Sequence, residues 1–152
     1  MGNSTINAGV GFDTVMVAGG HNTITVTGNQ NAITTGAGAD IVTLGNGWNN
    51  TIHGGSGSAT ITGGYGNTYV AGTGTLNITD FNAPYNDVLD LTHTEALLGV
   101  GAGAFSGAVD GGDPHALDVY VTDTHSVTSL IAVLHGANGS LASLLAAHAI
   151  HA

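Results

Sequence analysis

Residues 35–43 read Thr-Gly-Ala-Gly-Ala-Asp-Ile-Val-Thr, and residues 54–62 read Gly-Gly-Ser-Gly-Ser-Ala-Thr-Ile-Thr. In both blocks a glycine-rich half is followed by a short half that contains one large aliphatic residue. Residues 8–16 and 63–71 fit the same nine-residue frame. A period of nine suits neither an α-helix nor a long strand, whereas it suits a short strand joined to a tight glycine turn.

The aliphatic residue returns at nearly every ninth position. The spacing gains one residue near Trp48–Asn50 and loses one before Ile78. We expect these side chains to share one interior, and because one coil cannot bury its apolar side alone, the coils must stack. The predicted core ladder consists of Ile6, Val15, Ile24, Ile33, Val42, Ile52, Ile61, Val70 and Ile78.

The blocks resemble the Gly-Gly-x-Gly-x-Asp-x-(aliphatic)-x repeat of the hemolysin-type RTX family. The resemblance covers about half of the chain and implies a right-handed parallel β-roll whose turns bind Ca²⁺. We therefore expect an all-β fold, with an RTX-like β-solenoid roll at 1–79 and a small C-terminal cap of strands and a helix at 80–152.

The Asp position departs from the family, which leaves two alternatives for the turns. One predicted stack holds Asp13, Asn31, Asn50 and Thr68, and the other holds Ser4, Asn22, Asp40 and Ala59. Calcium prefers several carboxylates, so Asp13 and Asp40 are expected to bind Ca²⁺ at low occupancy or not at all. The alternative is a hydrogen-bonded turn ladder of Asn22, Asn31 and Asn50. Where roll meets cap, Asp80, Asp87 and Asp90 either hold one Ca²⁺ or are solvated turn acids.

Threonine recurs at the outward positions of alternate strands. The predicted surface ladder is Thr23, Thr25, Thr43, Thr60 and Thr62. Such Thr-x-Thr arrays resemble those of ice-binding solenoids. The alternative is ordinary exposed strand threonine, solvated or in lateral sheet packing.

Composition excludes several classes of partner. The chain has no Lys or Arg and ten acidic residues, with a net charge of −10. Nucleic-acid binding through phosphates and attraction to anionic lipid both need cations that are absent. No apolar run reaches the ~18 residues of a membrane helix, so no membrane insertion is expected. Without cysteine there are no disulfides, thiol nucleophiles or Cys-based zinc sites.

After Thr79 the sequence predicts a different structure. We expect a short helix at Thr94–Leu98, a glycine and alanine loop to Pro114, and strands at 116–122 and 127–135. Ser140 is the expected N-cap of a final helix, with one face made of Leu141, Leu144, Leu145 and His148.

The cap also resembles the C-terminal region of RTX proteins that type I machinery exports. The matching features are Ile78-Thr-Asp-Phe, the Asp87-Val-Leu-Asp-Leu-Thr segment and the final Leu-Leu-Ala helix. The resemblance implies the type I secretion machinery as a partner and an extracellular or cell-surface location. It agrees with the absence of a basic and apolar signal sequence at the N-terminus.

The sequence predicts no enzyme. No Gly-x-Ser-x-Gly occurs between a strand and a helix, and Glu95 is the single glutamate. Only His148 and His151 have helical spacing. We expect them to be either a pair of metal ligands or solvated side chains near the C-terminus.

The expected function is structural. Because the roll begins near residue 4, its first coil would be open, and a second copy is the expected cap. Head-to-tail stacking does not close and would build an extracellular filament or matrix. The alternatives are a calcium-binding RTX export and folding domain of a larger exoprotein, and an ice- or polysaccharide-binding module that uses the Thr ladder.

Overall fold

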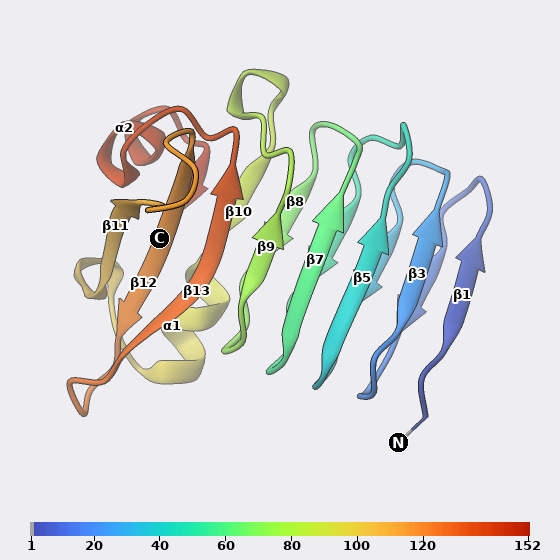
Figure 1. The fold of residues 1–152 in the computed structure, drawn as a ribbon, viewed down its shortest axis with the longest axis horizontal. Coiled ribbons are helices and arrows are strands. Elements are labelled where there is room, and N and C mark those ends of the chain that lie inside the picture. Colours follow the sequence, from blue (N-terminus) through green and yellow to red (C-terminus); the bar gives the residue numbers. More distant parts are fainter. Residues whose placement is uncertain (1) are drawn as a thin grey trace.

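The computed structural model describes residues 2–152 and shows a parallel β-solenoid of about five turns (Figure 1). Its first nine strands alternate between two sheets, and each pair of consecutive strands makes one coil. The strands are β1 Thr5–Ala8, β2 Thr14–Met16, β3 Thr23–Val26, β4 Ala32–Thr34, β5 Ala39–Thr43, β6 Thr51–His53, β7 Ser58–Thr62, β8 Thr68–Val70 and β9 Leu76–Ile78.

The remaining elements form the cap. The strands are β10 Val88–Asp90, β11 Phe105–Val109, β12 Ala116–Thr122, β13 Thr128–His135 and β14 Ile150–His151. Two α-helices, α1 Thr92–Leu98 and α2 Leu141–Ala146, accompany two 3₁₀ turns at Ala83–Tyr85 and Ala102–Ala104. None of the helices in residues 2–152 is long and apolar enough to cross a membrane.

The cap extends both sheets of the roll. Sheet A has the order β1-β3-β5-β7-β9-β13-β12-β11, and sheet B has the order β14-β10-β8-β6-β4-β2. Pairing is parallel as far as β13 in sheet A, and parallel throughout sheet B. Roll and cap thus share one set of backbone hydrogen bonds across the predicted boundary at residues 79 and 80.

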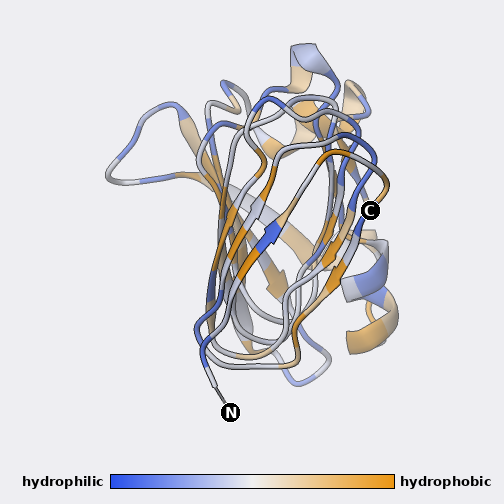
Figure 2. Cartoon of the chain, turned by 90° about the vertical axis from the view of Figure 1, so that its right-hand side faces the viewer, coloured by the Kyte–Doolittle hydropathy of each residue, from blue (hydrophilic) through white to orange (hydrophobic). Residues whose placement is uncertain are grey.

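The core lies between the two sheets (Figure 2). Sheet A stacks Ile6, Ile24, Val42, Ile61 and Ile78 in register, and sheet B stacks Val15, Ile33 and Ile52. From Ile24 onward these side chains are fully buried, each contributing roughly 1.5–3 kcal/mol. The nine-residue pattern therefore predicts the interior of the roll with one exception.

The exception is Val70, which the structure places one step out of register. Ile52 pairs with Tyr69, and Val70 instead lies beside His53 on the outer side of sheet B. The residue that is missing from the nine-residue spacing is therefore lost in the turn at 63–67, between Ile61 and Tyr69, and not in the segment before Ile78. Adjacent apolar residues allowed both alignments, and in the structure the buried ring of Tyr69 packs against Phe81 at 6.3 Å between centroids.

In the cap, the strand predicted at 116–122 is observed, and that at 127–135 begins one residue later. The Ser140 Oγ accepts a hydrogen bond from the backbone N–H of Ser143, as an N-cap does. The loop expected before Pro114 instead contains β11, which pairs antiparallel with β12. The final helix ends at Ala146, and the chain then turns through His148, with φ of 56°, into β14.

Candidate functional site

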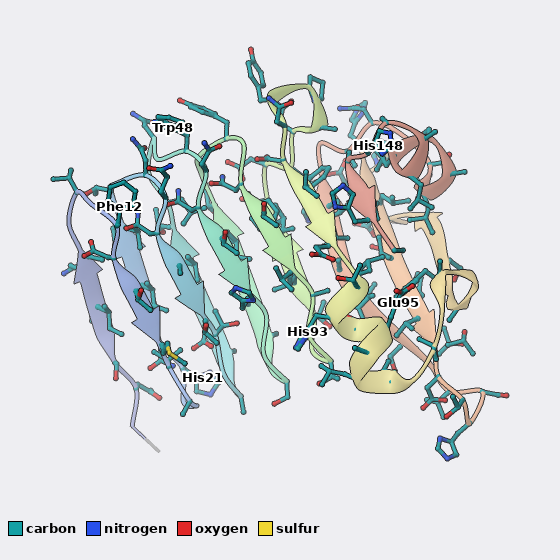
Figure 3. The ribbon with its side chains drawn as sticks, turned by 180° about the vertical axis from the view of Figure 1, so that it is seen from behind. Phe12, His21, Trp48, His93, Glu95 and His148 are labelled. Atoms are coloured by element: carbon teal, nitrogen blue, oxygen red, sulfur yellow. The ribbon has the colours of Figure 1, made fainter. Side chains whose placement is uncertain are left out.

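Two rows of turns connect the sheets, and they differ in the side chains they present. The aromatic turn row leads from sheet A to sheet B and comprises residues 9–13, 27–31, 44–50, 63–67 and 79–87. The small-residue turn row leads back to sheet A and comprises residues 17–22, 35–38, 54–57 and 71–75. The two rows form opposite edges of the solenoid, as the positions of Trp48 and His21 show (Figure 3).

A ladder of amide side chains runs beneath the aromatic turn row. The backbone N–H of Asp13 donates to Oδ1 of Asn31 at 2.7 Å. The backbone N–H and Nδ2 of Asn31 both donate to Oδ1 of Asn50, each at 2.9 Å. Asn50 donates in the same two ways to Oδ1 of Asn67, at 3.0 and 3.2 Å, and the N–H of Asn67 donates to Oδ1 of Asp87 at 2.9 Å.

The alignment of the turns in the sequence assigned Thr68 to this ladder. The structure places Asn67 there instead, because the shortened turn that puts Val70 out of register also shifts this position by one residue. Asp87, which the sequence assigned to the end of the roll, is the last member of the same ladder.

A shorter ladder lies beneath the small-residue turn row. The N–H of Ser4 donates to Oδ1 of Asn22 at 3.1 Å, and the N–H and Nδ2 of Asn22 donate to Oδ1 of Asp40 at 3.0 and 2.7 Å. The ladder ends there, because the next two positions are the apolar residues Ala59 and Leu76.

Both ladders end in a buried aspartate. An asparagine accepts from one coil and donates to the next, so the last member needs only an acceptor, which a carboxylate supplies. Asp40 and Asp87 are 2% and 1% exposed. Oδ1 of each is held by N–H donors, the Asp87 Oδ2 accepts from the N–H of Asn82 at 3.0 Å, and the Asp40 Oδ2 has no hydrogen-bond partner.

Burial affects the ionisation of Asp87, the last member of the ladder beneath the aromatic turn row. The pKa of Asp87 is raised to about 6, mainly by desolvation, against the opposing hydrogen bonds from Asn67 and Asn82. Burial also raises the pKa of Tyr69, whose hydroxyl accepts from Nδ2 of Asn67 at 3.4 Å. The polar end of this ladder thus lies in a poorly hydrated part of the molecule.

The structure does not bring the proposed calcium ligands together. Oδ2 of Asp80 accepts from the N–H of Gly63 at 2.8 Å, and Oδ1 of Asp90 accepts from the N–H and Oγ1 of Thr92, where α1 begins. Asp13 and Asp40 lie under opposite turn rows. In residues 2–152, no three acidic or histidine side chains are grouped as a metal site would require.

The histidines are mostly exposed and scattered. His148 and His151 do not share a helical face, because α2 ends before them. One defined pair joins the Nδ1 of His135 and Oδ2 of Asp113 at 2.9 Å, and this hydrogen bond holds the pKa of Asp113 below its usual range.

The threonines lie in two rows on the outer face of sheet A. In one row Ile41 lies between Thr23 and Thr60 and interrupts the threonines. The second row is continuous. Its members are Thr25, Thr43, Thr62 and, through an Oγ1–Oγ1 hydrogen bond of 2.8 Å from Thr62, Thr79. No helix covers this face (Figure 1).

A feature that the sequence analysis missed is the aromatic turn row itself. The protein has eight aromatic residues, and in the structure four are exposed, all on this row: Phe12, Trp48, Tyr65 and Tyr85. Trp48 and Tyr65 form a parallel backbone bridge, and the ring centroids of Tyr65 and Tyr85 are 6.1 Å apart.

A short motif places these rings. Trp48-Asn49-Asn50, Tyr65-Gly66-Asn67 and Tyr85-Asn86-Asp87 each read aromatic residue, left-handed residue, ladder residue. The middle residues have φ of 55°, 64° and 66°, a conformation that glycine and asparagine tolerate best. The third residue is buried and the first is exposed, so this signal was present in the sequence, although the nine-residue frame obscured it.

Comparison with known proteins finds no matching family model, no similar curated protein and no similar solved structure.

Proposed function

We propose that this chain is a secreted, non-catalytic structural protein that needs no calcium to fold and associates with a second copy through its first coil. The observation that carries the proposal is the exposure of that coil. Val10, Phe12 and Met16 are 86%, 81% and 73% exposed, the three highest values among the large apolar side chains of residues 2–152.

The first coil is also an open edge of both sheets. Within residues 2–152, β1 and β2 each pair with one neighbour only, so their outer N–H and C=O groups face away from the roll. Unpaired strand edges beside apolar side chains favour pairing with another chain. The only acid in this coil is Asp13, so charge repulsion opposes such pairing little.

The cap end of the solenoid differs from the first coil, and this difference favours one geometry of association over the other. There sheet A ends in β11, sheet B ends in the two-residue β14, and α2 contacts both strands. A first coil placed on this end would meet the antiparallel strand β11 and the two-residue β14, with α2 against both, instead of two edges of parallel roll strands. We therefore favour a head-to-head contact between two first coils, which closes into a dimer, over the head-to-tail filament expected from the sequence.

Association is tested by sedimentation velocity from 1 to 200 µM at neutral pH. The chain is expected to dimerise as concentration rises, and Phe12→Asp or Met16→Asp is expected to keep it monomeric by placing like charges in the contact. Leu97→Asp adds the same charge on an exposed position of α1 and is the matched control. A wild-type chain that stays monomeric throughout would contradict the proposal.

Independence from calcium is supported by the two ladders, in which N–H groups occupy the Oδ1 atoms of Asp40 and Asp87. Circular dichroism melting in 5 mM CaCl₂ and in EDTA is expected to give the same midpoint. A midpoint that rises by more than 10 °C with calcium would instead support the calcium-binding RTX export domain. Export is supported by the sequence resemblance of the cap to type I substrates.

A second candidate, ice binding, is favoured by the registered threonine rows on the uncovered face of sheet A. Strand spacing of ~4.8 Å makes such rows regular. Thr25, Thr43 and Thr60 replaced by tyrosine should abolish any thermal hysteresis while leaving the melting midpoint within a few degrees. A wild-type chain without thermal hysteresis removes this candidate.

A further inference from the structure

We infer that the aromatic turn row is a binding site for a neutral, extended polysaccharide, which stacks its sugar rings on Trp48, Tyr65 and Tyr85. This inference does not depend on the proposed association through the first coil, or on the threonine rows of sheet A.

The three rings lie outside although burial would be favourable for each of them. The chain is poor in aromatic residues, and burying one is strongly favourable. Nevertheless Trp48, Tyr65 and Tyr85 are 49%, 48% and 63% exposed in three successive turns. On the small-residue turn row the same chain uses no aromatic residue at all. Exposed aromatics confined to one edge indicate a contact surface.

The spacing of the rings suits a chain of sugar units. The three rings belong to consecutive coils, and coils in parallel register are ~4.8 Å apart. The ring centroids of Tyr65 and Tyr85 are 6.1 Å apart and their planes are tilted by 46°, so neighbouring rings are separated by roughly the length of one pyranose unit in an extended chain. Sugar rings present C–H groups on their faces, and these groups pack on the electron-rich faces of aromatic rings. A linear chain of such units would lie along the solenoid edge.

Polar side chains that can bind hydroxyl groups lie beside the rings. Asn49 and Asn86 line a shallow hollow together with Trp48, Tyr65 and Tyr85. An adjoining hollow holds Asn46, Asn82 and Asp80 beside the same two tyrosines. Carboxamides both donate and accept hydrogen bonds, so they match sugar hydroxyls, which also do both.

The charge of the aromatic turn row selects against anionic ligands. The aromatic turn row contains no histidine, and the whole chain has no Lys or Arg. A nucleic acid strand also stacks on aromatics, but it needs cations along its backbone, and an anionic polysaccharide has the same need. The acids on this row are Asp13, the buried Asp87 and the exposed Asp80. An uncharged ligand is therefore the one that fits.

The test uses Trp48, which is the only tryptophan in the protein. Soluble oligosaccharides from cellulose, chitin and xylan are titrated into the full chain while tryptophan emission and acrylamide quenching are recorded. At least one is expected to shift the emission and to reduce quenching at least twofold. Alginate fragments and a proline-rich peptide serve as the anionic and peptide ligands.

Variants locate the site. Tyr65→Ala or Tyr85→Ala is expected to weaken binding tenfold or more, and Trp48→Ala should do the same in pull-down on the insoluble polysaccharide. Leu97→Ala, an exposed apolar truncation on α1, and Thr43→Tyr on the face of sheet A should change affinity less than twofold. Melting curves confirm that each variant is folded.

Three results would overturn the inference. One is that no neutral oligosaccharide changes the emission. Another is that the peptide or alginate changes it while neutral oligosaccharides do not. The third is an emission that depends on protein concentration alone and returns to its dilute value in Tyr85→Ala, which would make the row a self-association surface.

Discussion

The two rows of turns perform the same task in different ways. Both reverse the chain between sheets, both contain a column of glycines, and both cover a ladder that ends in a buried aspartate. In the small-residue turn row the backbones pack directly, since a Cβ on Gly38, Gly57 or Gly74 would overlap a glycine carbonyl of the coil before. The aromatic turn row carries in addition a left-handed residue in each turn from 27–31 onward, and three of its turns expose a ring beside it.

The comparison separates two roles that a repeat can combine. Glycine columns and amide ladders serve stacking, and their replacement should affect stability. The exposed rings contribute little to stacking, and their replacement should affect only what binds there.

Replacing Gly57 by alanine is expected to lower the free energy of unfolding by about 3 kcal/mol or more, because the new Cβ would overlap the carbonyl of Gly38. Urea denaturation followed by circular dichroism measures this. Gly111→Ala is the control, since a Cβ there has no atom within 4 Å, and it should change stability by less than about 0.5 kcal/mol. Equal effects of both would show that close packing of the small-residue turn row is not what limits the roll.

Replacing Asn50 by alanine is expected to cost about 2–4 kcal/mol, because the N–H and Nδ2 of Asn31 would lose their acceptor in a buried position. The same denaturation assay applies. Asn46→Ala in the same turn is the matched control, since Asn46 is exposed. If Asn50→Ala is as mild as its control, the ladder is not a stabilising element.

The ionisation of Asp87 predicts that acidification stabilises the aromatic turn row. Its pKa is about 6 in the folded protein and about 4 when unfolded. The folded state therefore holds the proton more tightly, and this contribution to stability is present below pH 4 and lost as the pH rises through 6.

Lowering the pH from 7 to 5 should therefore raise the free energy of unfolding by about 1–2 kcal/mol more in the wild type than in Asp87→Asn. Denaturation at the two pH values in both proteins measures the difference. Identical pH dependence in the two proteins would show that Asp87 is not protonated on folding.

Tyr65→Ala and Tyr85→Ala are expected to change the free energy of unfolding by less than about 0.5 kcal/mol, because both rings are about half exposed or more. Thermal melting and urea denaturation measure this. Tyr69→Ala is the contrasting variant, because its ring is buried and its loss should cost about 3–5 kcal/mol. A large loss from either surface ring would place the aromatic turn row among the structural elements.

The limits of the sequence prediction follow from local ambiguity. The nine-residue period indicates eight of the nine core positions, because the count between coils selects the inward residue even where a second apolar residue adjoins it, as Met16 adjoins Val15 and Ile41 adjoins Val42. It misplaces Val70, since the turn at 63–67 is one residue shorter and Tyr69 beside Val70 is apolar as well. It misses β11, because Phe-Ser-Gly-Ala-Val has no strong strand signal of its own and is a strand only where β12 offers a partner.

The candidate sites show the same division. Asn22, Asn31 and Asn50 could be proposed from spacing, whereas Asn67 and Asp87 required the register of the shortened coil. The exposure of Trp48, Tyr65 and Tyr85 was not evident from the sequence, because an aromatic residue in a turn with few other apolar residues can be either buried or exposed.

The sequence by itself determined that the chain coils and stacks, since large aliphatic side chains that recur every nine residues can be buried together only between stacked coils. Only the tertiary structure decided which oxygen faces which donor, where each ladder ends, and which rings remain outside. Those features depend on the register between coils, and one residue gained at Trp48 or lost before Tyr69 changes that register for every residue that follows.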